Sequence, residues 1–222
     1  MQNHDLVTVP GPEAVIFDLE GTIIDTEPIW DHGTQIFLRR RGRVYDSNIT
    51  KHLVMGRTAA EGAAIMQAQY DFPGDPVELG AERKEIIYDL LANEVDLIPG
   101  FDRFYETVSA AYPTAIATSM ERALFKRVDR RLGLAELFGG HVYSIEDIGF
   151  IAKPNPDIFL YAAARLGVNP KRCVAVEDAP HGVTSAKAAG MYCVALTTSV
   201  GPEHLQHADQ IVDHYDDIVI PS

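Results

Sequence analysis

The residues best suited to chemistry are two pairs of acids that directly follow short apolar runs. Asp18 and Glu20 come after the run Ala14–Phe17, and Glu177–Asp178 come after Cys173–Val176. Short runs rich in β-branched residues that stop at polar residues are typical of buried strands. Carboxylates at such strand ends can bind Mg²⁺ or attack an electrophile. When the first stretch is read alone, an ordinary strand end followed by an acidic turn explains it equally well.

Other polar residues follow the remaining apolar runs of the chain. Thr118 and Ser119 end the run Thr114–Ala117, and Lys153 lies on a loop beside a proline. Gly21 allows the loop after the first acid to approach an anion closely. Because ligands of open α/β sheets bind beyond the carboxyl ends of the strands, we expect all of these side chains at one edge of a sheet.

Neighbouring carboxylates repel one another, and a divalent cation relieves that repulsion. Mg²⁺ prefers oxygen ligands and needs only one or two carboxylates beside a substrate phosphate. With Mg²⁺ bound, Asp18 could attack phosphorus while Lys153 stabilises the transferring group and Thr118 donates a hydrogen bond to it. Water would then cleave the acyl phosphate, so the residues favour covalent catalysis in two displacements.

The elements that must position these residues alternate between helix and strand after residue 100. The pattern predicts strands at 14–17, 114–117, 141–143, 173–176, 193–196 and 210–212, and helices at 101–111, 122–132, 157–166 and 182–189. Such alternation predicts an α/β fold with a Rossmann-like parallel sheet and helices on both faces.

Residues 26–97 contain helical patterns and no strand pattern, which indicates a helical domain inserted into the sheet domain. Three helices are expected there, from residue 26 or 27 to 41, from a capping box at Thr58 to Tyr70, and from Pro76 to Asn93. We therefore predict a core of residues 1–25 and 98–222 and an inserted domain of residues 26–97.

Composition restricts the partners of the protein. The 222 residues carry a formal net charge of −13, which argues against a nucleic-acid or anionic membrane partner. Cys173 and Cys193 lie in apolar runs and are expected to be buried thiols in a reducing compartment. No apolar run could span a bilayer, and Met1–Pro12 lacks the regions of a signal peptide. We expect a cytoplasmic protein, monomeric or weakly dimeric, with a small phosphorylated metabolite as partner.

Four segments together resemble, in order and spacing, the motifs of the haloacid dehalogenase superfamily of phosphatases. These are Phe17–Thr22, the strand that ends in Thr118, Lys153–Pro154, and Glu177–Asp178 followed by Gly182. The resemblance covers nearly the whole chain from Ala14 onward. The segments Asp25–Asp31 and Glu177–Val183 are similar to those of bacterial sugar-phosphate phosphatases and pseudouridine-5′-phosphatase. The resemblance implies that the inserted helices form a C1 cap over a Rossmann-like core.

The resemblance also implies roles for the matched residues. Asp18 would be the nucleophile, Thr118 the phosphate hydrogen-bond donor and Lys153 the charge-stabilising lysine. Arg57, in a loop that the analogy places on the cap, would bind an anionic or hydroxyl-rich part of the substrate. The expected substrate-binding residues are Gly21, Thr22, Arg57, Thr118, Ser119 and Lys153.

For the metal, the resemblance implies Mg²⁺ held by Asp18 and Asp178 with Glu177 beside them, while Glu20 offers its backbone carbonyl. Glu20 stands where phosphatases of the family normally carry an aspartate that acts as acid and base. Its extra methylene displaces the carboxyl group, and a misplacement of about 1 Å can cost ~100-fold in rate. Three hypotheses follow: a slow phosphatase, an enzyme for another leaving group, and a binding protein with little turnover.

We favour the first hypothesis, a Mg²⁺-dependent phosphomonoester hydrolase acting on a sugar phosphate or a nucleotide-like compound. A phosphonate hydrolase and a phosphomutase are the further alternatives. Mutase activity is disfavoured because Trp30 occupies a position where a mutase of the superfamily carries histidine. Trp30 itself is expected to be a core residue of the cap rather than a platform for substrate.

Overall fold

The computed structural model describes residues 11–54 and 57–221. The chain divides into two compact units. The core unit comprises the described residues up to Asp25 and from Leu97 onward, and the helical unit comprises those of Thr26–Asp96. The α/β fold predicted from the sequence is confirmed.

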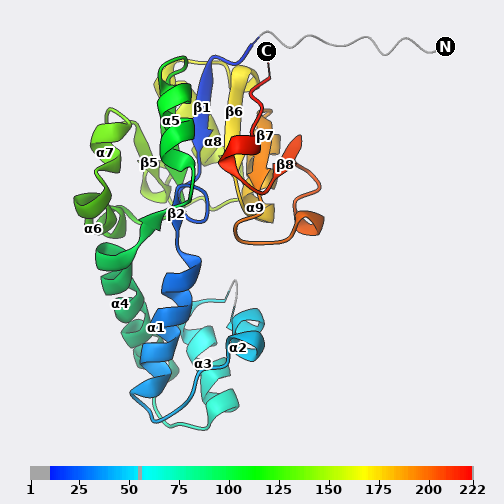
Figure 1. Ribbon diagram of the computed structural model, residues 1–222. Coiled ribbons are helices and arrows are strands. Elements are labelled where there is room, and N and C mark those ends of the chain that lie inside the picture. The colour runs from blue at the N-terminus through cyan, green and yellow to red at the C-terminus, as the bar shows by residue number, and fades with distance from the viewer. Residues whose placement is uncertain (1–10, 55–56, 222) are drawn as a thin grey trace, which may run out of the picture. The chain divides into compact units, whose positions relative to one another are not determined.

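The core unit contains a six-stranded sheet in the order β5-β4-β1-β6-β7-β8 (Figure 1). Its strands are β1 (Ala14–Phe17), β4 (Thr114–Thr118), β5 (Val142–Ser144), β6 (Cys173–Glu177), β7 (Tyr192–Leu196) and β8 (Gln210–Val212). Every neighbouring pair is parallel. Since β1 lies between β4 and β6 and all three strands point the same way, their carboxyl ends meet at one edge of the sheet.

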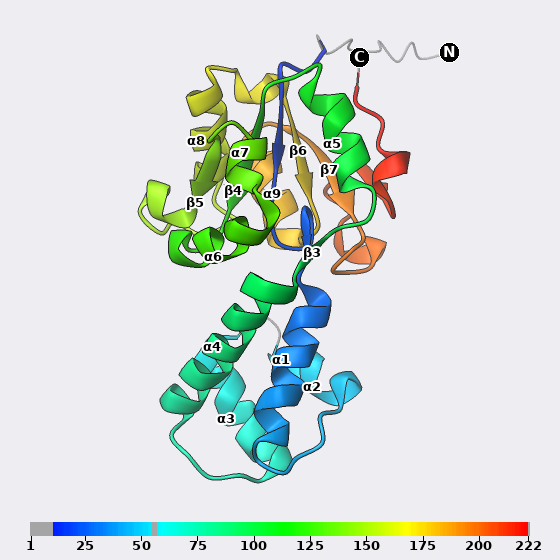
Figure 2. The same cartoon turned by 60° about the vertical axis from the view of Figure 1, so that its left-hand side comes forward.

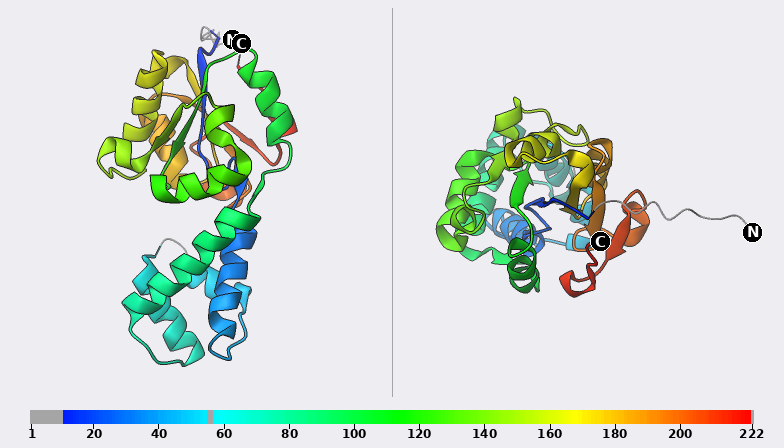
Figure 3. Two further views of the ribbon diagram at one scale, coloured as in Figure 1. Left: turned by 90° about the vertical axis from the view of Figure 1, so that its left-hand side faces the viewer. Right: turned by 90° about the horizontal axis from the view of Figure 1, so that it is seen from above.

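Helices cover both faces of this sheet, as the views in Figures 2 and 3 show, with α8 and α5 on opposite sides of the strands. The helices of the core unit are α5 (Phe101–Ser109), α6 (Arg122–Leu132), α7 (Leu134–Leu137), α8 (Asp157–Leu166) and α9 (Pro180–Ala188). Short 3₁₀ helices lie at Ile145–Ile148, Pro170–Arg172, Pro202–His204 and Tyr215–Asp217.

The buried strands explain the unbroken apolar runs in the sequence, because a parallel sheet is covered on both faces. On one face Ile16 packs with residues of α8 and α9, among them Phe159 and Val183. On the other face the centre of the Phe17 ring lies 5.8 Å from the centres of the Phe101 and Phe138 rings. Consecutive residues of β1 therefore anchor opposite layers, which fixes the position of the residue that follows, Asp18.

The helical unit consists of α1 (Glu27–Arg39), α2 (Ser47–Val54), α3 (Ala59–Tyr70) and α4 (Pro76–Glu94). The capping box predicted at the start of α3 is present: the Thr58 amide donates to Glu61 Oε2 (2.9 Å), and the Glu61 amide donates to Thr58 Oγ1 (3.3 Å). Helix α1 approaches α4 so closely that a Cβ at Gly33 would lie 2.5 Å from Ile87 Cγ1.

Three features of this region differ from the sequence prediction or were missed by it. The expectation that Trp30 is a core residue is wrong, because 37% of its surface is exposed. Helix α2 was missed, since its apolar residues Ile49 and Leu53 are exposed and mark no buried stripe. The two-residue strands β2 (Ile24–Asp25) and β3 (Asp96–Leu97), which form a second sheet, are too short to leave a pattern.

Two further expectations concern exposure and membranes. Cys173 and Cys193 are buried and unpaired, as expected. Among the helices of the described residues, none combines the length and the hydropathy needed to cross a membrane. Of the segment Met1–Pro12, in which no signal peptide was expected, residues 1–10 lie outside the described residues.

Candidate active site

The edge of the sheet at the carboxyl ends of the strands collects most of the polar residues singled out in the sequence. Asp18 follows β1 directly, and its amide donates to the carbonyl oxygen of Val176 on β6 (2.9 Å). Glu177 is the last residue of β6, and Thr118 is the last residue of β4, the other neighbour of β1. All three side chains are at least nine-tenths buried.

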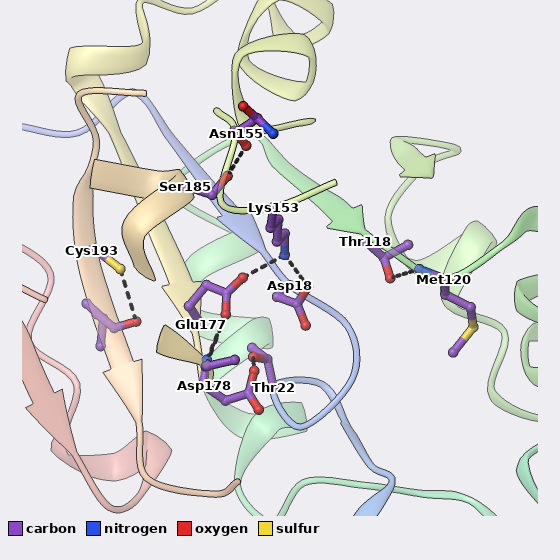
Figure 4. Close-up of polar contacts among 12 residues, drawn as sticks. Asp18, Thr22, Thr118, Met120, Lys153, Asn155, Glu177, Asp178, Ser185 and Cys193 are labelled. Carbon is purple, nitrogen blue, oxygen red and sulfur yellow. Dashed lines mark hydrogen bonds and ion pairs between the residues drawn. The ribbon is translucent and has the colours of Figure 1, made fainter. Parts of the chain in front are cut away.

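Lys153 links two of the acids (Figure 4). Its Nζ donates to Asp18 Oδ1 at 2.5 Å and to Glu177 Oε1 at 2.6 Å. The Lys153 side chain is only 3% exposed, and its Nζ lies 4.9 Å from the centre of the Phe159 ring on α8. A buried ammonium is therefore held between two carboxylates, on a loop whose Asn155 carbonyl accepts a hydrogen bond from Ser185 of α9 (2.6 Å).

Burial and mutual repulsion govern the protonation of the acids. Burial raises the pKa of Asp18 to about 7, although the neighbouring Lys153 acts in the opposite direction. Burial, followed by the charges of Glu177 and Asp18, raises the pKa of Asp178 well above its usual range. Burial disfavours the charged form of Lys153, but the neighbouring Asp18 and Glu177 favour that form more strongly, so the pKa of Lys153 is raised. The cluster therefore needs added positive charge to hold all of its carboxylates ionised.

Asp18, Glu177 and Asp178 form a site of the kind that binds a divalent cation. Each offers a carboxylate oxygen, and these oxygens lie within 4.8 Å of one another. All three residues are buried, and an all-oxygen donor set matches the preference of Mg²⁺. At Asp178, burial and the charges of Glu177 and Asp18 outweigh the charge of Lys153, so an added cation would favour the ionised form of this carboxyl group.

Hydroxyl groups on two different loops lie beside Asp178. Thr22 Oγ1 donates to Asp178 Oδ1 at 3.3 Å, and the Ser199 hydroxyl lies near the same carboxylate and acts to lower its pKa. Sequence reasoning missed Ser199. The signal was present, because Thr197, Thr198 and Ser199 follow the predicted strand at 193–196 and so belong to the same edge of the sheet.

Two glycines are required by close approaches at this edge. Gly21 has φ +76°, and a Cβ there would lie 2.1 Å from Asp178 Oδ2. A Cβ at Gly182 on α9 would lie 2.0 Å from the Glu177 carboxyl group. Glycine at both positions lets the first loop and helix α9 close around the acids.

The remaining predicted residues are less closely connected. Thr118 Oγ1 accepts a hydrogen bond from the Met120 amide (2.9 Å), and Ser119 is exposed. Glu20 is partly buried, and burial raises the pKa of its carboxyl group. Arg57 belongs to the helical unit, where it is exposed and lines a cavity. Met55 and Gly56, part of the same predicted loop, lie outside the described residues.

Comparison with known proteins identifies the family of this chain. A family model described as haloacid dehalogenase-like hydrolase matches residues 12–190. The fructose-1-phosphate phosphatase YqaB of Escherichia coli K12 is 35% identical over 81% of this chain and 94% of that protein. A probable pseudouridine-5′-phosphatase of Drosophila melanogaster is 32% identical over 89% and 87%. A haloacid dehalogenase family hydrolase from Deinococcus radiodurans R1, solved with bound phosphate and sodium, superposes with a TM-score of 0.81 at 27% identity, covering 94% of each chain.

The family model and the parallel sheet together define a hydrolase with an α/β fold. The chain belongs to the haloacid dehalogenase-like hydrolase family, which confirms the resemblance seen in the sequence. Within that family it is an enzyme of the phosphatase type, as its named relatives are.

Proposed function

We propose that this protein is a Mg²⁺-dependent phosphomonoester hydrolase that acts on a small phosphorylated metabolite through an aspartyl-phosphate on Asp18. The observation that carries the proposal is the bridge made by Lys153, whose Nζ contacts both Asp18 and Glu177 beside the buried acid cluster. Such an arrangement holds a nucleophile and a cation together where the charge of a phosphoryl group would develop.

In this proposal the free carboxylate oxygen of Asp18 attacks phosphorus, and Glu20 protonates the departing ester oxygen. Glu20 then accepts a proton from the water that attacks the acyl phosphate, which releases inorganic phosphate and restores Asp18. Lys153 and the Thr118 hydroxyl stabilise the negative charge on the transferring group. Both displacements are balanced, because the proton given to the leaving alcohol returns from the attacking water.

The residues proposed to hold Mg²⁺ are Asp18 and Asp178, with Glu177 beside them and the backbone carbonyl of Glu20 as a further ligand. When bound, the ion would supply positive charge that favours ionised carboxylates and binds phosphate oxygens. The Thr22 and Ser199 hydroxyls orient Asp178 for this purpose.

The proposed substrate is a sugar phosphate or a nucleotide-like compound. Support comes from the relatives, whose names specify fructose 1-phosphate and pseudouridine 5′-phosphate. We propose further that the helical unit is a cap that recognises the part of the substrate beyond the phosphate. A cytoplasmic location and a monomeric or weakly dimeric state stay predictions.

Glu20 gives a specific reason to test a second function, that of a phosphate-binding protein with little turnover. The experiment compares hydrolysis of p-nitrophenyl phosphate with Mg²⁺ by the wild type, Asp18→Asn and Glu20→Asp. Asp102→Asn, which changes an exposed acid on α5, serves as the control. We expect Asp18→Asn to be inactive and the control to match the wild type. Wild-type activity no greater than that of Asp18→Asn would refute the proposal and favour the binding protein.

A further inference from the structure

Tyr215 is a buried titratable residue that the proposed mechanism does not use. It begins the 3₁₀ helix Tyr215–Asp217, and only 1% of its surface is exposed. Its hydroxyl donates to the carbonyl oxygen of Thr22 at 2.8 Å, although the two residues are 193 positions apart in the chain. A buried tyrosine hydroxyl needs a hydrogen-bond partner. Here the partner is the backbone of the loop that follows β1 and begins with Asp18.

The Tyr215 ring is fixed against helix α5. Its centre lies 5.7 Å from the centre of the Phe101 ring and 5.2 Å from that of Phe104, and both phenylalanines belong to α5. An ion pair joins the same two elements, because Arg103 Nη2 donates to both carboxylate oxygens of Asp216 at 2.8 Å. In Figure 2 this red part of the chain lies beside α5. The packing therefore holds the hydroxyl in one position, as a donor to the loop.

The loop after β1 is held by its backbone carbonyls. The carbonyl oxygens of the three successive residues 21–23 accept hydrogen bonds from segments that are distant in the chain. The donors are, in order, the Thr198 hydroxyl, the Tyr215 hydroxyl and the Ile98 amide. Because buried carbonyl groups without a donor are costly, each of these contacts restricts the path of the loop. Tyr215 supplies the middle one.

The side chain of Thr22 connects this backbone contact with the acid cluster (Figure 4). Thr22 is fully buried, and its Oγ1 donates to Asp178 Oδ1 at 3.3 Å. The carbonyl that accepts from Tyr215 and the hydroxyl that contacts Asp178 belong to the same residue. A displacement of the Thr22 peptide would therefore also displace the hydroxyl beside Asp178.

The surroundings of Tyr215 keep its hydroxyl protonated. Burial, followed by the charges of Asp178 and Asp18, raises the pKa of Tyr215 well above its usual range. A phenol that keeps its proton serves as a hydrogen-bond donor and not as a base. The hydroxyl is thus suited to hold the loop and not to transfer protons.

From these contacts we infer that Tyr215 is a positioning residue of the active site, which holds the Thr22 peptide so that the Thr22 hydroxyl orients Asp178 for Mg²⁺. The inference rests on the proposed function, because it assumes that the acid cluster binds the ion. It gives the last 3₁₀ helix a part in metal binding that the four sequence motifs do not include. A residue that only supported the fold would change stability and leave metal affinity unchanged.

A pair of matched variants separates these two roles. Tyr215→Phe keeps the ring and removes only the hydroxyl that donates to Thr22. The control is Tyr105→Phe, because Tyr105 is 5% exposed and its hydroxyl donates to the Leu137 carbonyl at 2.7 Å. That hydroxyl also lies 3.1 Å from Thr114 Oγ1, at the end of β4 remote from the acid cluster. Both variants take a buried donor from a backbone carbonyl, so both should lower Tm by several degrees.

Mg²⁺ affinity is measured without substrate, by isothermal titration calorimetry of metal-free protein and by the rise of Tm with MgCl₂. Tyr215→Phe should raise the Kd for Mg²⁺ about 10-fold, as loss of a group that orients a metal ligand does, while Tyr105→Phe should leave it at the wild-type value. In steady-state assays with p-nitrophenyl phosphate, Tyr215→Phe should need about 10-fold more Mg²⁺ for half-maximal activity. Its kcat at saturating Mg²⁺ should stay within about 3-fold of the wild type, because Tyr215 does not touch the reacting atoms.

The outcomes distinguish this inference from the proposed function. A Kd for Mg²⁺ that is unchanged in Tyr215→Phe, or that rises equally in both tyrosine variants, would overturn the inference and leave the proposed function standing. A wild type that binds no Mg²⁺ and hydrolyses no phosphate ester would contradict the proposed function, and the inference with it.

A double variant tests the route through Thr22. Thr22→Val keeps the shape of the side chain, removes the hydroxyl beside Asp178 and should itself raise the Kd for Mg²⁺ about 10-fold. If Tyr215 acts through that hydroxyl, adding Tyr215→Phe to Thr22→Val should change the Kd little further. Effects that multiply to about 100-fold in the double variant would show that Tyr215 acts independently of Thr22, and would refute the inference. Circular dichroism establishes that each variant is folded.

Discussion

Replacement of Lys153 by methionine tests whether the buried bridge controls the charge of the site. The change keeps an unbranched side chain of similar length and removes the ammonium between Asp18 and Glu177, which lies 2.5 and 2.6 Å from their oxygens. Burial already raises the pKa of Asp18 to about 7 with Lys153 present. Without the ammonium, two neighbouring buried carboxylates cannot both stay ionised, so the folded site must take up an additional proton.

The loss of a buried partner sets the expected loss of stability. Removing one partner of a buried ion pair leaves an uncompensated charge and costs about 3–5 kcal/mol, so we expect a loss of about 4 kcal/mol at pH 7 and a smaller loss at pH 5, where protons neutralise the carboxylates. The sign follows from proton binding: the folded variant holds one more proton than its unfolded chain, so its stability falls as pH rises above about 4.

The assay is urea denaturation of metal-free protein, followed by far-ultraviolet circular dichroism at pH 5 and pH 7 in the presence of EDTA. The control is Lys187→Met, because Lys187 Nζ contacts Asp209 Oδ2 at 2.5 Å in the same unit but the two side chains are 34% and 31% exposed. That partly exposed pair should contribute less than about 1 kcal/mol. The reasoning would be refuted if Lys153→Met lost less than about 1 kcal/mol of unfolding free energy at pH 7 and lost the same amount at pH 5.

Three further predictions concern catalysis and the metal. Glu20→Asp should hydrolyse p-nitrophenyl phosphate as fast as the wild type or faster, because it retracts the carboxyl group by one methylene; a drop of more than 10-fold would contradict the proposed acid role. Ser199→Ala should raise the Mg²⁺ concentration needed for half-maximal activity several-fold while Ser199→Thr keeps it near the wild-type value, since Ser199 orients Asp178. Mg²⁺ should raise Tm more at pH 8 than at pH 5, because protons compete with the ion for the Asp18 and Asp178 carboxylates, whose pKa values are raised. An equal rise in Tm at both pH values would argue against this cluster as the Mg²⁺ site.

Local signals in the sequence were sufficient to predict several elements with their bounds. Helices α6 and α8 begin and end where the pattern placed them, at Arg122–Leu132 and Asp157–Leu166. Both end before a glycine, Gly133 or Gly167, that adopts the left-handed conformation. A glycine stop acts through the backbone of a few neighbouring residues, so it can be interpreted without knowledge of the rest of the fold.

The position of Trp30 could not be interpreted in the same way. Its spacing from Ile29 and Gly33 fits a helix, but two sides of that helix carry large or apolar residues. Helix α4 decides which side of α1 is buried, because Ile87 of α4 occupies the space beside Gly33 of α1. The exposed ring therefore follows from contacts between helices, which the periodicity of one helix does not specify.

The sequence by itself determined that carboxylates and hydroxyls follow the strands of the sheet and that a lysine lies on a loop between two of them. Local patterns mark where each strand ends, and the alternation of strand and helix predicts that the strands are parallel. Only the tertiary structure decided which of them touch. Asp18 and Lys153 are 135 residues apart in the chain, and their contact depends on the packing of α8 against the sheet. The same holds for Ser199, which reaches Asp178 from another loop. Distances of this kind arise from the whole core, since each element is placed by its neighbours rather than by its own sequence.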